Sequence, residues 1–220
     1  LYGICAQANG ATPIAAPDTN LTPDVDNLLA ACTDQTRLVF LANPNNPTGT
    51  RLNAQEVERL AAGLPPKALL VVDAAYAEFV TGDDYDSGQS LASRRENVVM
   101  TRTFSKIYGL AALRIGWLYG PAHVIDVLNR VRGPFNVNAA AQAAAMAAVN
   151  DADYVAWCAA KNVELKARTV EALEALGLPS IPSSANFILT EFGQSETDGA
   201  AAADTFLKSR GIIIRRMDGY

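Results

Sequence analysis

Short apolar runs that end abruptly at polar residues constrain the fold of this chain more than any other feature. Four such runs occur, at residues 37–42, 68–72, 97–101 and 115–119. The first stops at NPNNPTG (residues 43–49), a run of turn-forming residues that fits neither a helix nor a strand. Continuous apolar runs of this length are typical of strands buried on both faces of a mostly parallel sheet. The sequence therefore predicts such a sheet, with loops that begin where each strand ends.

Helical patterns lie between and after these runs, and this alternation predicts an α/β fold. Asn53 with Glu56 three positions later indicates the start of a helix that runs to about Ala62. Further helices are expected at residues 124–131, 138–149, 153–176 and 198–210, and further strands at 186–190 and 212–215. We therefore expect a partial large domain at residues 1–150 and part of a smaller α+β domain at residues 151–220.

Composition excludes several classes of protein. The net charge of −5 over 220 residues argues against nucleic-acid binding, and no apolar run reaches the length of a membrane helix. The cysteines Cys5, Cys32 and Cys158 are widely spaced, which is typical of buried or half-buried thiols in a cytosolic protein. A single histidine, His123, leaves little room for a histidine metal site, and it is expected at the surface.

Polar residues follow the apolar runs at the points where ligands collect in open α/β sheets. Asn46 follows the first run, Asp73 and Tyr76 follow the second, and Lys106 and Arg114 follow the third. Taken singly, each has an ordinary structural explanation: a turn asparagine, a capping carboxylate, a solvated lysine. Their order and spacing along one chain favour a shared site.

That order resembles a known family. NPNNPTG, then DAAY, then TFSK with an arginine eight residues after the lysine are similar to the fold-type-I pyridoxal-phosphate aminotransferases. Residues 101–116 resemble the segment that carries the cofactor lysine in that family. Residues 132–138, 184–187 and 211–215 are similar to the branch that acts on histidinol phosphate, and the resemblance extends over essentially the whole chain.

The resemblance implies pyridoxal 5'-phosphate as the cofactor and a cytoplasmic homodimer. It also implies amino transfer between histidinol phosphate and 2-oxoglutarate in histidine biosynthesis. Lys106 would carry the cofactor as a Schiff base and move the proton at the substrate Cα. Asp73 would pair with the pyridine nitrogen, and a protonated ring is the stronger electron sink. Tyr76 and Asn46 would contact the phenolic oxygen.

Thr103, Ser105 and Arg114 would hold the phosphate by the same resemblance, since two hydroxyls and a guanidinium suit a dianion. The apolar neighbours of Arg114 predict that its partner is buried. Arg215, at the end of the last expected strand, and Asn186 would bind substrate. Arg216 would face solvent instead, because adjacent strand residues point to opposite faces. Glu78 is left open between a substrate-pocket group and a surface carboxylate.

Other functions remain open from the sequence. An aromatic amino-acid aminotransferase and a pyridoxal-phosphate decarboxylase of a phosphorylated amino acid share most of these residues. A cofactor-binding effector domain of a transcription regulator is the non-enzyme alternative, although nothing in these residues supplies a DNA-binding module. The family's phosphate loop and ring-stacking aromatic would precede Leu1, and its last substrate arginine would follow Tyr220. We therefore interpret the chain as an internal fragment, with little or no activity of its own.

Overall fold

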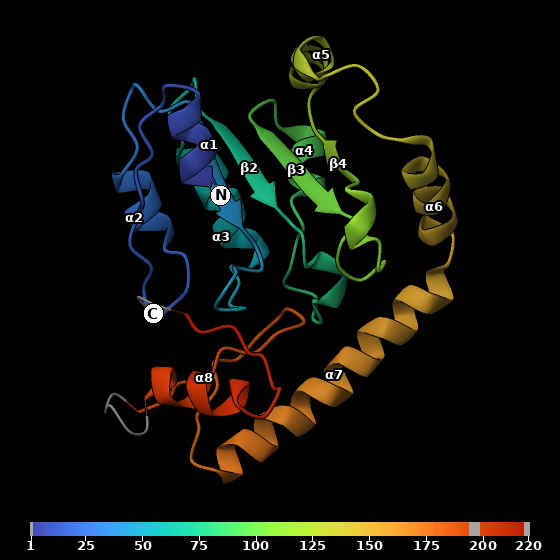
Figure 1. Ribbon diagram of the computed structural model, residues 1–220. Helices are drawn as coiled ribbons and strands as arrows, with labels where there is room; N and C mark the ends of the chain where they lie inside the picture. The colour runs from blue at the N-terminus through green and yellow to red at the C-terminus, as the bar shows by residue number, and fades with distance from the viewer. Residues whose placement is uncertain (1, 194–198, 218–220) are drawn as a thin grey trace.

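The computed structural model describes residues 2–193 and 199–217. Its centre is a four-stranded sheet in the order β1-β2-β3-β4 (Figure 1). The strands are β1 (Leu38–Ala42), β2 (Leu69–Asp73), β3 (Val98–Thr103) and β4 (Gly116–Tyr119). The first three run parallel, and β4 runs antiparallel to β3. The predicted α/β fold with a mostly parallel sheet is therefore confirmed.

The main hydrophobic core lies on one face of the sheet, beneath three helices. These are α2 (Val25–Ala30), α3 (Ala54–Gly63) and α4 (Gln89–Arg94). Alternate residues of β1 and β2 point into this core, which also contains Val57 and Leu60 of α3. The side chain of Asn53 accepts the backbone N–H of Glu56, so the expected cap of α3 forms. The register of the strands is thus set by which residues reach this core.

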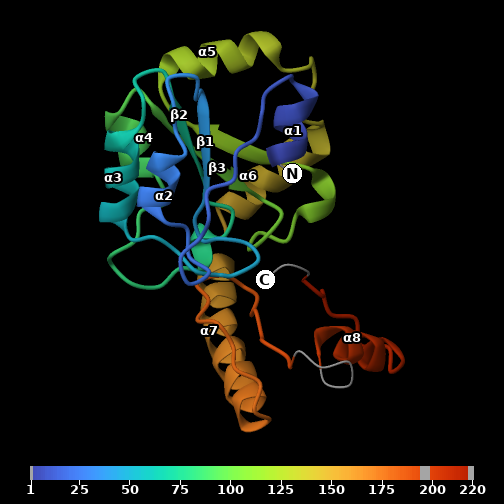
Figure 2. The ribbon, with the colours of Figure 1, turned by 90° about the vertical axis from the view of Figure 1, so that its left-hand side faces the viewer.

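The opposite face of the sheet is only partly covered. Two helices lie on that side, α1 (Tyr2–Ala8) and α6 (Ala139–Val149) (Figure 2). Leu38 of β1 is 53% exposed, and Phe40 is covered mainly by the Tyr2 ring, which stacks on it at 4.6 Å between centroids. The expectation of strands buried on both faces holds for residues 98–100 of β3 and is wrong for β1, whose burial alternates.

Two long segments lead away from the sheet. After β4 comes α5 (Ala122–Val131), and α6 leads into the 24-residue helix α7 (Ala152–Ala175), which begins at the Asp151 cap. Gly177 follows α7 with φ +75°, a left-handed conformation that suits a glycine just after a helix. The chain then turns back beneath the lower ends of the strands and reaches α8 (Ala200–Lys208) (Figure 1).

The two expected C-terminal strands do not form. Residues 186–190 contribute one isolated bridge, between Thr190 and Ser180, and residues 212–215 are irregular. A segment of strand-forming residues becomes a strand only where a neighbouring strand supplies the hydrogen bonds. Among the described residues, no segment pairs with residues 186–190 or 212–215 beyond that bridge. The expected helix 198–210 is observed as α8, while Asp198 itself lies outside the described residues.

Smaller expectations divide in the same way. Cys32 and Cys158 are half-buried as expected, but Cys5 is exposed because it lies on α1, which buries none of its residues. His123 is exposed as expected, 3.2 Å from Glu96. Among the described residues, no helix combines the length and hydropathy that a membrane crossing requires.

Candidate active site

The parallel strands bring the polar residues that follow them to one edge of the sheet. Asn46 lies in the turn after β1, Asp73 ends β2, and Lys106 lies in the loop after β3. The Nδ2 of Asn46 donates a hydrogen bond of 2.7 Å to the Tyr76 hydroxyl. The Lys106 Nζ lies 5.1 Å from the centroid of the Tyr76 ring. An amine, a phenol and an amide from three loops therefore meet in one place, with the carboxylate of Asp73 at the end of the central strand.

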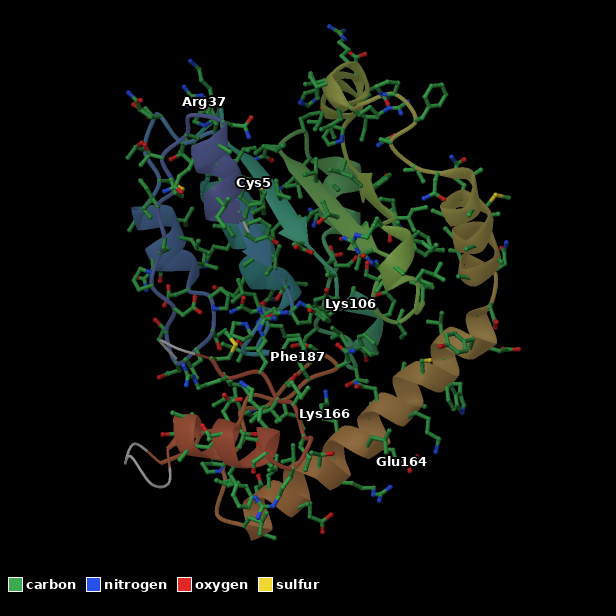
Figure 3. All side chains as sticks on the ribbon, viewed as in Figure 1. Cys5, Arg37, Lys106, Glu164, Lys166 and Phe187 are labelled. Atoms are coloured by element: carbon green, nitrogen blue, oxygen red, sulfur yellow. The ribbon has the colours of Figure 1, made fainter. Side chains whose placement is uncertain are left out.

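Tyr76 is the buried member of this group. It is 6% exposed and precedes the short 3-10 helix η1 (Ala77–Phe79). The ring of Phe187 packs edge-on against it, with 5.1 Å between centroids. Lys106 and Phe187, which are far apart in the sequence, lie in the same region below the strands (Figure 3). The Tyr76 ring is thus held by packing on one side, and its hydroxyl accepts the hydrogen bond from Asn46.

The segment that carries Phe187 is anchored from two directions. Ser184 N–H donates to the carbonyl of Gly49, and α7 supplies Lys166, whose ammonium donates to the carbonyls of Ser183 and Ala185. Burial lowers the pKa of Lys166. Lys166 is therefore not a solvated helix residue, because it holds the segment beside the site.

Asp73 accepts hydrogen bonds through both carboxylate oxygens. Its Oδ1 accepts the backbone N–H of Ala75 at 3.2 Å, and its Oδ2 accepts the Tyr2 hydroxyl. Burial, followed by the hydrogen bond to Asp73, raises the pKa of Tyr2, so this hydroxyl stays a donor. An ionised carboxylate has about four acceptor positions, so further donors can still approach. Tyr2 was not among the residues expected at the site.

Three residues on either side of Lys106 offer donors for an anion: Thr103, Ser105 and Arg114. The Ser105 backbone N–H donates to the Thr103 Oγ1 at 3.0 Å, and Arg114 Nη1 lies 3.4 Å from the Ser105 Oγ and 2.7 Å from the Ala111 carbonyl. Arg114 is exposed, with a left-handed backbone at φ +52°, so the expected buried partner is wrong. Its apolar neighbours do not cover it because η2 (Ala111–Leu113) buries none of its residues.

The two expected substrate residues are less well defined. Asn186 is exposed and lies next to Phe187, so the structure brings its segment to the site. Arg215 is exposed in the irregular chain after α8. Within the described residues, no hydrogen bond or ion pair links it to Lys106 or Asp73. Since residues 212–215 form no strand, the alternation that separated Arg215 from Arg216 does not apply.

The sequence did not reveal a buried ion pair behind the site. Arg102 of β3 and Glu78 of η1 pair at 2.6 Å, with side chains only 13% and 7% exposed. Glu78 is therefore not a surface carboxylate, and because it pairs with Arg102 it is not a free group in a substrate pocket. The signal available was a charged residue within a central strand, because a buried charge needs a partner of opposite charge.

The donor set fits pyridoxal phosphate. A carboxylate suits a pyridinium nitrogen, the Asn46–Tyr76 pair suits a phenolate oxygen, and two hydroxyls with a guanidinium suit a phosphate. Lys106 supplies the amine that a carbonyl cofactor requires. Each of these groups lies at the end of a strand or in a loop at the same edge of the sheet.

Comparisons with known proteins agree with this chemistry. The family model for aminotransferase class I and II matches residues 2–219. The histidinol-phosphate aminotransferase of Dinoroseobacter shibae is 57% identical over 220 residues, which are all of this chain and 60% of that protein. That of Cereibacter sphaeroides (strain ATCC 17029) is 56% identical with the same coverage. The chain thus spans about 60% of the length of these curated relatives.

The fold is similar to solved structures as well. The crystal structure of histidinol-phosphate aminotransferase from Sinorhizobium meliloti in complex with pyridoxal-5'-phosphate superposes with a TM-score of 0.88 at 31% identity. The match covers 97% of this chain and 58% of that one.

Proposed function

The chain belongs to the class I and II aminotransferases, and we propose that the full-length protein transfers an amino group between histidinol phosphate and 2-oxoglutarate, using pyridoxal 5'-phosphate. The names of relatives at 52–57% identity support this substrate. The observation that carries the proposal is the meeting of Lys106, Tyr76 and Asn46 beside the carboxylate of Asp73.

When bound, the cofactor supplies an electron sink for the charge that develops at the substrate Cα. Lys106 would hold the cofactor covalently, and its amine would carry the proton that leaves the substrate Cα. The amine lies over the Tyr76 ring, and the Phe187 ring packs edge-on against that ring. A base that is already held in position needs little reorganisation before it takes the proton.

The neighbouring residues orient the ring and hold its anions. Asp73 would keep a proton on the pyridine nitrogen, because an adjacent anion favours the charged form of a base. Asn46 and Tyr76 would donate to the phenolic oxygen. We propose that the hydroxyls of Thr103 and Ser105, with Arg114, bind the phosphate.

Further parts of the proposal concern substrate and assembly. Asn186 lines the substrate side, since its segment adjoins the site, and Arg215 binds a substrate anion. The protein is a cytoplasmic homodimer, as the family resemblance implies. The division into a large domain at residues 1–150 and a small one at 151–220 is proposed as well; α7 begins just after the proposed boundary.

Steady-state rates on the full-length protein test the proposal. We expect turnover with histidinol phosphate and 2-oxoglutarate, and a much lower kcat/KM with phenylalanine. Threonine phosphate is the third substrate, measured for release of carbon dioxide. Faster turnover of phenylalanine would assign the protein to aromatic amino acids, and decarboxylation of threonine phosphate would assign it to the decarboxylases. Absence of all three activities in cofactor-loaded protein would contradict an enzymatic function of this class.

A further inference from the structure

A buried ion pair lies behind the proposed site. The Arg102 Nη2 lies 2.6 Å from the Glu78 Oε1, and its guanidinium lies 5.5 Å from the centroid of the Trp117 ring. Taking two charges out of water is costly even when they attract each other, so such pairs add little to stability compared with apolar residues. A role other than stability is therefore the better explanation of this one.

The pair connects two parts of the site that are distant in sequence. Glu78 lies two residues after Tyr76, and Arg102 lies four residues before Lys106. Tyr108, two residues after Lys106, lies close enough to the same carboxylate to be affected by its charge. Burial, followed by the charge of Glu78, raises the pKa of Tyr108. The Tyr108 ring in turn packs against Phe104 at 4.9 Å between centroids. Glu78 therefore pairs with Arg102 before the lysine and lies near Tyr108 after it.

We propose that Glu78 is a positioning residue. It joins Arg102 and Tyr108, which lie on either side of Lys106 in the sequence, to the turn that carries Tyr76. It thereby sets where the Lys106 amine lies relative to the Tyr76 ring. This inference deepens the proposed function and rests on Lys106 being the cofactor lysine.

The physical consequence is specific to the reaction step. Without the carboxylate, Arg102 keeps a buried charge that has lost its partner, and its Nε is already without a partner among the described residues. The loop then shifts to bring the guanidinium toward water. A displacement of about 1 Å between reacting groups can cost on the order of a hundredfold in rate. Binding of the substrate, which depends on other residues, changes little.

The test uses the full-length, cofactor-loaded enzyme and three variants. Glu78→Gln removes the charge while keeping the shape, and Tyr108→Phe removes only the hydroxyl on the far flank. Glu164→Gln is the matched control, because Glu164 forms an exposed ion pair with Lys161 on α7 (Figure 3). Three quantities are measured: kcat and KM separately, the visible circular dichroism of the cofactor, and hydrogen exchange of residues 103–110 in cofactor-free protein.

We expect Glu78→Gln to lower kcat by about 10- to 100-fold with KM within about twofold. The visible circular dichroism should weaken, and hydrogen exchange of residues 103–110 should accelerate. Tyr108→Phe should cause the same changes to a smaller degree, and Glu164→Gln none. If Glu78→Gln does not fold, Tyr108→Phe decides the question alone.

Unchanged kcat, circular dichroism and exchange in the folded variants would overturn the inference. A fall confined to thermal stability, with kcat intact, would do the same. Failure of the proposed function looks different: wild-type protein would then show no cofactor absorption that depends on Lys106, whatever residue 78 is.

Discussion

Gly49 is the position where a single methyl group should disturb the site most directly. It ends the NPNNPTG turn that carries Asn46, and its backbone is left-handed at φ +76°. A Cβ there would lie 2.2 Å from the Ser183 Oγ and 3.0 Å from the Ser183 Cα. Ser183 begins the segment that leads to Phe187. Gly49→Ala therefore tests whether the turn and this segment are in contact.

The expected cost has two parts. A left-handed backbone costs an alanine about 1–2 kcal/mol. The hydroxyl of Ser183 can rotate away, but its Cα belongs to the backbone, so the two segments must separate at an overpacking cost of about 1–3 kcal/mol. We expect the free energy of unfolding to fall by about 2–5 kcal/mol in total.

Gly177→Ala is the matched control, because Gly177 has φ +75° and nothing within 4 Å of an added Cβ. Both variants carry the same backbone cost, so the difference between them isolates the contact with Ser183. Urea unfolding of the full-length protein measures both free energies. Adding Ser183→Gly to Gly49→Ala should recover part of the loss. Equal free energies for the two alanine variants would refute the proposed packing of the turn against the segment.

Three further outcomes are expected. Burial raises the pKa of Tyr85. The stability that this residue contributes is therefore present below the ordinary tyrosine pKa of about 10 and is lost as the pH rises above it. Tyr85→Phe should reduce that alkaline loss of stability, measured as the urea midpoint of unfolding against pH. Lys166→Met should lower the free energy of unfolding by about 1–2 kcal/mol, since two carbonyls of residues 183–185 lose their donor, whereas Lys161→Met on the exposed face of α7 should change it little. Arg114→Gln should raise the dissociation constant of the cofactor by about 10- to 100-fold in a fluorescence titration, and an unchanged constant would remove Arg114 from the phosphate site.

Local pattern sufficed for the parts of the fold that depend on neighbouring residues. Apolar runs, turn residues and the cap at Asn53 predicted the strands and helices around the sheet. Parallel strands place their carboxyl ends at one edge, so residues that follow the strands were expected to lie together. Asn46 and Tyr76 are indeed in contact across 30 residues of sequence.

Contacts between distant residues were beyond this kind of prediction. Nothing near Glu78 in the sequence points to Arg102, because the pair forms only when η1 packs beside β3. The sequence around Lys166 is that of an ordinary solvated helix and does not indicate that the segment 183–185 packs against α7. The failed strand at residues 186–190 has the same cause, since strand formation depends on a partner that local sequence does not specify.

The central claim is that Lys106 carries the cofactor, and borohydride trapping tests it most directly. Borohydride converts the covalent link between a lysine and pyridoxal phosphate into a stable amine, which peptide mapping by mass spectrometry then locates. In the full-length protein we expect the modified residue to be Lys106, with no covalent label in Lys106→Ala and normal labelling in Lys166→Ala. Labelling of another lysine in the wild type, or an undiminished label in Lys106→Ala, would contradict the account.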